Sequence, residues 1–174
     1  MCPLPNRLPA WRRGRGFTLI EMIMVMVMIG ILAVVVIPRL DIRAFKDVGF
    51  RDKARGALEF ARKAAVAQRR NVQVSLTGAN NDLTFKIDNV GPEAVGAGTY
   101  PRSLALPATD PACGGATNKV CVPTGPNSVT LISSLGLVPL TFSPLGQPSA
   151  AATYTVTGAS TFTLTVELET GLVH

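Results

Sequence analysis

The sequence has 174 residues, of which 47% are hydrophobic and 16% are charged, and its mean hydropathy is +0.31. This length fits one compact domain, and the apolar content excludes a disordered chain. Lysine and arginine total 17 against 11 acids, but four of the arginines fall in residues 1–16. Residues 17–174 therefore have a formal charge near +2. A charge this small does not indicate a nucleic-acid-binding protein.

The first predicted element is an apolar helix over residues 17–37, in which Glu21 is the single charge. At 1.5 Å per residue this helix would be roughly 30 Å long, which matches the hydrocarbon core of a membrane. The arginines Arg12, Arg13 and Arg15 before it predict a cytosolic N-terminus, with the rest of the chain outside. The alternatives fit less well. No small-residue cleavage site of a secretory signal peptide follows the segment, and a buried helix of a soluble domain is rarely this long and apolar.

Glu21 is the informative residue of this segment. A carboxylate within hydrocarbon costs on the order of 2.5–3.5 kcal/mol, so it should have a partner or lie near an interface. Cleavage between Gly16 and Phe17 would create an α-amine four residues before Glu21. Positions i and i+4 share one helix face, so this amine and the carboxylate could neutralise each other within one subunit or between neighbours.

The run Arg15-Gly16-Phe17-Thr18-Leu19-Ile20-Glu21 resembles the cleavage and methylation motif of type IV pilins and type II secretion pseudopilins. The resemblance implies that residues 1–16 are a leader, that prepilin peptidase cuts after Gly16, and that Phe17 is then N-methylated. It also implies that Glu21 is the charge that sets the register of assembly.

The same resemblance implies two successive roles for residues 17–40. They would first be a transmembrane helix among the lipids of the bacterial inner membrane, and later the core of a helical filament built with other pilins or pseudopilins. Gly30 and Pro38 lie where this family tends to have helix weak points, and both residue types weaken a helix. Local unwinding there during assembly is therefore expected.

Residues 41–70 are predicted to form an amphipathic helix. Apolar residues recur there at three- and four-residue spacing, namely Phe50, Ala54, Ala57, Leu58, Ala61, Ala64 and Ala65. No proline separates Leu40 from Arg70, so one helix about 80 Å long is expected from about residue 17 to residue 70. The basic residues of its polar face could contact anionic lipid head groups, but we favour a solvated face.

Residues 71–174 are predicted to form a β-rich periplasmic head. Apolar and polar residues alternate over 72–76 and 83–87 around a turn, and again over 154–156 and 162–168; segments 129–132 and 137–142 are weaker strand candidates. The expected fold class is α+β and pilin-like, with a long N-terminal helix, transmembrane and then amphipathic, packed against an antiparallel β-sheet head.

Residues 89–128 are rich in Pro, Gly, Thr and Ala without periodicity, and are predicted to be a long variable loop. This loop holds Cys113 and Cys121, the two cysteines that follow the leader. Outside the cytosol they could form a disulfide. A metal pair is the alternative, although His174 is the one histidine that could join it.

Together with the alanine-rich helix over 57–67 and the strand over 72–76, three later motifs resemble the GspH/FimT-type minor pseudopilins and the MSHA-type minor pilins. They are Phe60-Ala61-Arg62, the run LTFSPLG at 140–146, and ETGLV at 169–173. This resemblance implies a minor pseudopilin, a structural subunit of the type II secretion pseudopilus that assists protein export across the outer membrane. The alternative is a minor pilin of a type IV, MSHA-like pilus with a role in pilus assembly, adhesion or DNA uptake.

Other activities have little support in the sequence. Some FimT-type relatives bind DNA through basic C-terminal residues, but this chain has no lysine or arginine after Lys119, which argues against nucleic acid as a partner. A membrane-tethered enzyme would not explain Glu21, and one C-terminal histidine cannot build a Ser-His-Asp arrangement. Asp82, Asp88 and Glu93 could bind calcium but form no ordered ligand loop, so we expect no catalytic residue, cofactor or metal.

Overall fold

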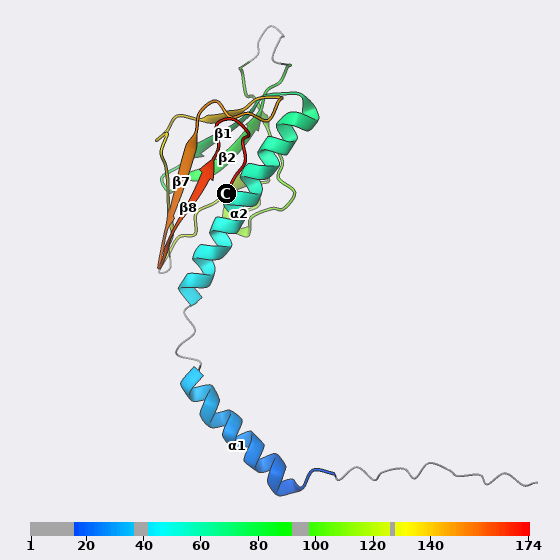
Figure 1. Cartoon of the computed structure of the whole chain (residues 1–174), viewed down its shortest axis with the longest axis vertical. Helices are drawn as coiled ribbons and strands as arrows, with labels where there is room; N and C mark the ends of the chain where they lie inside the picture. Colours follow the sequence, from blue (N-terminus) through cyan, green and yellow to red (C-terminus); the bar gives the residue numbers. More distant parts are fainter. Residues whose placement is uncertain (1–15, 37–41, 92–97, 126–127) are drawn as a thin grey trace, which may run out of the picture. The chain divides into compact units, whose positions relative to one another are not determined.

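The computed structural model describes residues 16–36, 42–91, 98–125 and 128–174, in two units divided after Asp41 (Figure 1). The described part of the first unit consists mainly of helix α1 (Leu19–Val36). Gly30 lies inside α1 without interrupting it. Pro38 and the residues that would join 17–36 to 42–70 in the single expected helix lie outside the described residues, so the continuity of that helix stays a prediction. Within the described ranges, no helix combines the length and the apolar character needed to cross a membrane.

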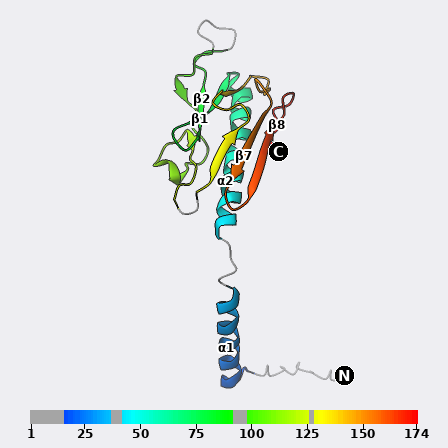
Figure 2. The ribbon, with the colours of Figure 1, turned by 90° about the vertical axis from the view of Figure 1, so that its left-hand side faces the viewer.

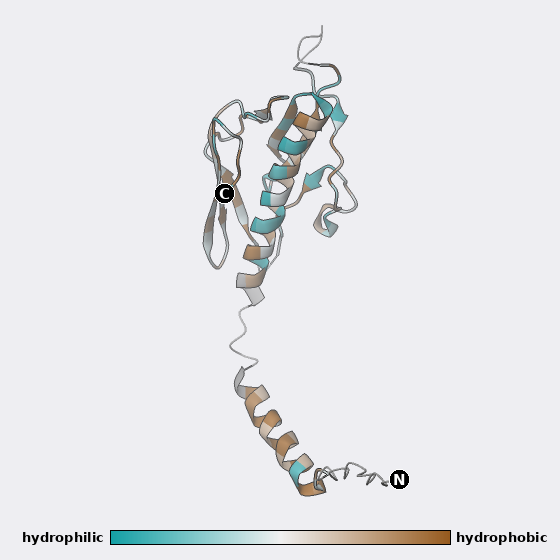
Figure 3. Ribbon diagram, turned by 45° about the vertical axis from the view of Figure 1, so that its right-hand side comes forward, coloured by the Kyte–Doolittle hydropathy of each residue, from teal (hydrophilic) through white to brown (hydrophobic). Residues whose placement is uncertain are grey.

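The two helices differ in how apolar residues are distributed around them. Figure 3 shows α1 coloured as hydrophobic along nearly all of its length, whereas α2 (Ile42–Gln68) alternates between hydrophilic and hydrophobic colours. The predicted alanine stripe of α2 is buried, with Ala54, Ala61 and Ala65 at 0% exposure. Alanine side chains are short, so the sheets can approach this face of the helix closely.

The end of α2 is closed by its own backbone. Arg69 adopts a left-handed conformation with φ 50°, and the N–H of Arg70 donates to the carbonyl oxygen of Ala65 at 3.1 Å. This six-to-one hydrogen bond is the pattern that ends many helices, usually with glycine in the left-handed position. The chain then turns directly into the first strand.

The second unit packs α2 against two antiparallel sheets, which Figure 2 shows beside the helix. The first sheet has the order β3-β2-β1-β6, with β4 also paired to β2, and the second has the order β5-β7-β8. The strands are β1 (Val72–Thr77), β2 (Asp82–Ile87), β3 (Arg102–Ser103), β4 (Lys119–Val120), β5 (Thr130–Ser133), β6 (Leu140–Phe142), β7 (Ala152–Thr157) and β8 (Thr161–Val166). The α+β fold class with an antiparallel head is confirmed, and the head contains two sheets.

Alternation explains why the two long hairpins form as predicted. In the β7–β8 pair, Tyr154 lies opposite Leu164 and both are buried, while Thr155 lies opposite Thr163 on the outer face. The β1–β2 pair follows the same rule, with Val74 opposite Phe85 in the core. Period-two patterns of this kind place one apolar row against the core.

The segment 89–128 is less uniform than the predicted long loop. This segment contains β3, the short 3-10 helix η2 (Pro111–Cys113) and β4, and both strands pair with β2. Strands of two residues are too short to show a periodicity, so their pairing partner determines them. Two other strand candidates are shorter than predicted, because only 140–142 of the segment 137–142 pairs and β8 ends at residue 166.

Candidate functional site

The predicted cleavage motif lies at the start of α1. Thr18 precedes the first helical residue, and its Oγ1 accepts the backbone N–H of Glu21 at 3.3 Å. The carbonyl oxygen of Thr18 accepts the N–H of Met22 at 3.2 Å. A threonine followed three residues later by glutamate is the sequence of a helix capping box. All these contacts begin at Thr18, so cleavage after Gly16 would remove none of them.

Glu21 lies in the first turn of α1, where a carboxylate interacts favourably with the unpaired N–H groups of the helix. A free amine at Phe17 would place a positive charge at the same end, which is the unfavourable sign there. Glu21 would offset that charge. Within the described part of the chain, the Glu21 carboxylate makes no hydrogen bond or ion pair, so it is available to a group from outside it.

The surface of α1 is apolar on all sides. Its large hydrophobic side chains are exposed in the single chain, and they are Leu19, Ile20, Met22, Ile23, Met24, Val25, Met26, Val27, Met28, Ile29, Ile31, Leu32 and Val34. Phe17, just before the helix, is 80% exposed. A helix that is hydrophobic all round needs lipid or other chains around it.

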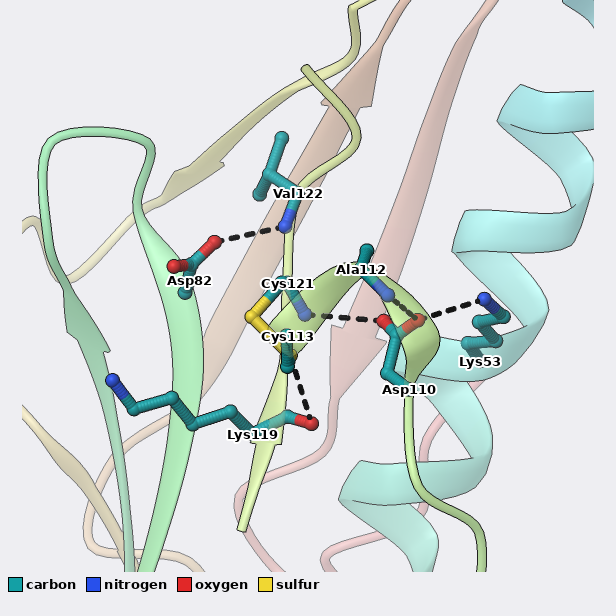
Figure 4. A network of polar contacts seen from close by, with 8 residues as sticks. All are labelled: Lys53, Asp82, Asp110, Ala112, Cys113, Lys119, Cys121 and Val122. Atoms are coloured by element: carbon teal, nitrogen blue, oxygen red, sulfur yellow. Dashed lines mark hydrogen bonds and ion pairs between the residues drawn. A yellow bond between two sulfur atoms is a disulfide. The ribbon is translucent and has the colours of Figure 1, made fainter. Parts of the chain in front are cut away.

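A second cluster centres on Asp110, in the segment that was predicted to be a loop. Asp110 is 6% exposed, and its Oδ1 accepts the ammonium of Lys53 at 3.1 Å and the N–H of Ala112 at 3.2 Å (Figure 4). Its Oδ2 accepts the N–H of Cys121 at 3.2 Å. Since Lys53 belongs to α2, this carboxylate joins the segment to the helix.

Cys113 and Cys121 form a disulfide within the same cluster, with 5.3 Å between their Cα atoms. Asp82, at the start of β2, accepts the N–H of Val122 at 2.8 Å, just beyond the disulfide (Figure 4). The disulfide and the two carboxylates together fix the path of residues 110–122. These contacts give the segment a structural role, and sequence analysis identified the cysteines but missed Asp110.

The candidate calcium ligands are used otherwise. Asp88 is fully buried, and its carboxylate accepts the N–H groups of Gly98 at 2.7 Å and Val90 at 3.3 Å, while Asp82 accepts that of Val122. Glu93 lies outside the described residues. Across the described ranges, no three histidine, cysteine or acidic side chains are grouped so that they could hold a metal ion.

The three later motifs of the sequence meet at one place, around Arg62 of α2. Gly146 and Gly171 both have left-handed backbones, with φ of +82° and +65°. A β-carbon on Gly171 would lie 2.2 Å from the carbonyl oxygen of Gly146 and 3.3 Å from Nε of Arg62. A β-carbon on Gly146 would also lie 3.3 Å from Nε of Arg62. The arginine side chain therefore fits against two turns that only glycine allows to come so close.

Nε of Arg62 is buried and has no hydrogen-bond partner among the described residues. Buried polar nitrogens are normally bonded, so this one calls for an explanation. Sequence analysis singled out each of the three motifs, but their meeting depends on how the sheets pack on α2.

Comparisons with known proteins agree with this architecture. The model of the prokaryotic N-terminal methylation motif matches residues 11–37, and that of the type II transport protein GspH matches residues 52–171. The minor pseudopilin EpsH from the Type 2 Secretion System of Vibrio cholerae has a similar structure, with 14% identity, a TM-score of 0.50, and coverage of 77% of this chain and 95% of that chain.

The type IV minor pilin FimU of Pseudomonas aeruginosa (strain PAO1) gives 15% identity, a TM-score of 0.49, and coverage of 75% of this chain and 88% of that chain. The search of curated proteins found no match. At these identities the structural likeness concerns the fold.

Proposed function

The chain belongs to the family of the type II transport protein GspH, and we propose that it is a minor pseudopilin of a type II secretion system. The matched residues 52–171 cover most of the second unit, and the methylation motif at 11–37 covers the first helix. A minor pilin or pseudopilin role follows from this membership. The choice of the secretion system is our proposal, and the description of the matching family supports it.

We propose the following course for the chain. Prepilin peptidase removes residues 1–16 by cutting after Gly16 and methylates Phe17. The segment 17–37 anchors the product in the inner membrane by a single pass, with its N-terminus in the cytosol and its head in the periplasm. The chain then joins other pseudopilins in a helical filament that assists protein export.

One observation carries this proposal, namely the exposed apolar surface of α1 directly after the cleavage motif. Burying apolar area contributes about 25 cal/mol per Å², so a helix exposed on all sides gains strongly from lipid or from neighbouring helices. A filament core provides such neighbours once the helix leaves the lipid. Membership of this family supports the order in which lipid surrounds the helix first and the filament core surrounds it last.

Glu21 gives the assembly step its specificity in this scheme. An unpaired carboxylate among apolar helices is costly, and pairing it with the Phe17 amine of a neighbour removes that cost. Only one stagger between two helices brings these groups together, because the remaining surface of α1 is apolar. The pair therefore sets the register of neighbouring subunits.

The test separates the charge of Glu21 from its place in the helix cap. Glutamine also fits the third position of a capping box, so Glu21→Gln keeps the helix start and removes the charge. We expect this variant to insert into membranes and to be cleaved after Gly16, but to enter filaments poorly, and Glu21→Leu to behave alike. Thr18→Ala is the matched control, because it weakens the cap and keeps the charge. Normal assembly of Glu21→Gln would contradict the proposed role.

The choice of machine is tested by deleting the gene in its own host. A pseudopilin of a type II secretion system is required for export, so folded exoproteins should accumulate in the periplasm while surface pili stay normal. Complementation with the native gene should restore secretion, and complementation with the Glu21→Gln variant should not. Loss of pili with normal secretion would overturn the secretion assignment and favour the type IV pilus.

A further inference from the structure

The surface around Arg62 holds one cation and one anion that have no partner within the described residues. Glu169 is exposed on the turn that leads to Gly171, and neither it nor Arg62 makes a hydrogen bond or an ion pair with another described residue. The other acidic side chains described in this unit are all engaged, and they are Asp47, Asp52, Glu59, Asp82, Asp88, Asp110 and Glu167.

Exposed apolar side chains lie next in sequence to the two glycines that pack on Arg62, or one helical turn from Arg62 itself. Leu145 precedes Gly146 and is 82% exposed, and Leu172 follows Gly171 and is 47% exposed. Val66 is one turn along α2 from Arg62 and is also 47% exposed. A central arginine with apolar neighbours is the composition found at the energetic centre of protein interfaces.

We propose that this surface, composed of Arg62, Val66, Leu145, Glu169 and Leu172 and called the Arg62 surface, docks on the same surface of a second copy of the chain. A contact between identical surfaces has twofold symmetry, so each residue pair occurs twice. Arg62 of each copy then meets Glu169 of the other through the end of its guanidinium group, since Nε is buried, and the two unpaired charges neutralise each other. The leucines and valines of the two copies cover one another around these pairs.

Charge complementarity favours a second copy of the chain as the partner of the Arg62 surface. A surface with a single sign of charge would require a different partner, but the Arg62 surface carries both signs and is therefore complementary to itself. A twofold contact closes on itself and produces pairs, whereas a filament grows through contacts between different surfaces. The pair is thus a state of the chain outside the filament. The inference concerns the second unit alone and does not rest on the proposed function.

Sedimentation velocity of the full chain in detergent micelles, over a range of concentrations, tests the proposal. The wild type should show a concentration-dependent dimer. Arg62→Glu and Glu169→Arg should each weaken dimerisation at least about tenfold, because each places like charges opposite one another. Lys63→Glu, which makes the same charge change at the neighbouring exposed position of α2, should leave the dimer unchanged.

The decisive sample is an equimolar mixture of the Arg62→Glu and Glu169→Arg chains. In a mixed pair, the two substituted positions face each other with opposite charges, and so do the native Arg62 and Glu169, so the mixture should dimerise although neither variant does so alone. Arg62 also packs against two glycines, whereas Glu169 is exposed, so Glu169→Arg tests the contact without disturbing the fold. A wild type that stays single, a Glu169→Arg chain that still pairs, or a mixture that does not pair would each overturn the proposal.

Discussion

The carboxylate of Asp47 lies against Gly158 and fills the space that a β-carbon would need there. A β-carbon on Gly158 would lie only 2.2 Å from Oδ1 of Asp47. Asp47, near the start of α2, is 2% exposed, and its Oδ2 accepts the N–H of Ser160 at 3.0 Å. This charge-assisted hydrogen bond holds the turn between β7 and β8 against the helix. Residue 158 is therefore glycine because of close approach, since its backbone is not left-handed.

Gly158→Ala should destabilise the second unit, because the added methyl group meets the buried carboxylate. Overpacking of this kind costs about 2 kcal/mol, and the loss should appear as a lower midpoint of urea unfolding followed by circular dichroism. Ala159→Ser, at the next and exposed position, is the matched control and should leave the midpoint unchanged. Equal midpoints for the two variants would contradict the close approach.

A second pair of glycine variants separates steric contact from backbone strain. Gly171 and Gly136 have similar left-handed backbones, with φ of +65° and +62°, but a β-carbon on Gly136 meets no atom within 4 Å. Alanine at either position strains the backbone by about 1 kcal/mol. Gly171→Ala should cost clearly more than Gly136→Ala in thermal unfolding, because it also clashes with the carbonyl oxygen of Gly146. Similar losses would mean that the turns near Arg62 can move apart.

Reduction of the disulfide should destabilise the second unit. The bond closes a loop with a sequence separation of 8, for which chain entropy predicts a contribution of about 2–3 kcal/mol. Urea unfolding with and without reductant measures this difference. A chain with Cys113→Ser and Cys121→Ser should already be destabilised and should not respond to reductant. A wild-type midpoint that is the same under both conditions would show that Asp82 and Asp110 hold the segment without the disulfide.

Stability should also fall at high pH because of Tyr154. Burial raises the pKa of Tyr154 to about 12, and a hydrogen bond with Ser133 offsets part of that rise. An unfolded tyrosine ionises near pH 10, so between about pH 10 and 12 the unfolded chain loses a proton that the folded chain keeps. This favours unfolding by about 2 kcal/mol at the upper end of the window.

Tyr154→Phe cannot ionise, so it should lose less stability than the wild type between these two pH values. Lysines contribute equally to the pH dependence of stability in the wild type and in Tyr154→Phe. Their contribution therefore cancels when the two chains are compared over the same pH series. An identical pH dependence of the two chains would show that Tyr154 is accessible to solvent in the folded state.

Local patterns were sufficient to predict the elements that carry strong periodicity. The alanine stripe of α2 and the alternation of β1, β2, β7 and β8 each mark one apolar face, and a face of this kind has to be buried. The strands β3 and β4 were missed, because two residues display no period and their pairing with β2 is set by the tertiary fold. The division into two sheets was missed for the same reason, since alternation does not specify which strands are neighbours.

The candidate sites were predictable to different degrees. Gly16, Phe17 and Glu21 are contiguous in sequence, so their chemistry could be inferred without a structure. Asp110 gives no local signal, because its partners on α2 and at Cys121 are distant or lie across a turn. The three motifs around Arg62 were recognised one by one, but their convergence needs the glycine turns that follow β6 and β8, strands of different sheets, to reach the same helix.

The most direct test of the central claim is the N-terminus of the native protein. Mass spectrometry of the chain purified from the membranes or filaments of its own host should show a product that begins at Phe17 and carries one added methyl group. That product would contain the amine that Glu21 is proposed to neutralise. An intact chain that begins at Met1, or a shortened chain that begins at any residue other than Phe17, would contradict the account.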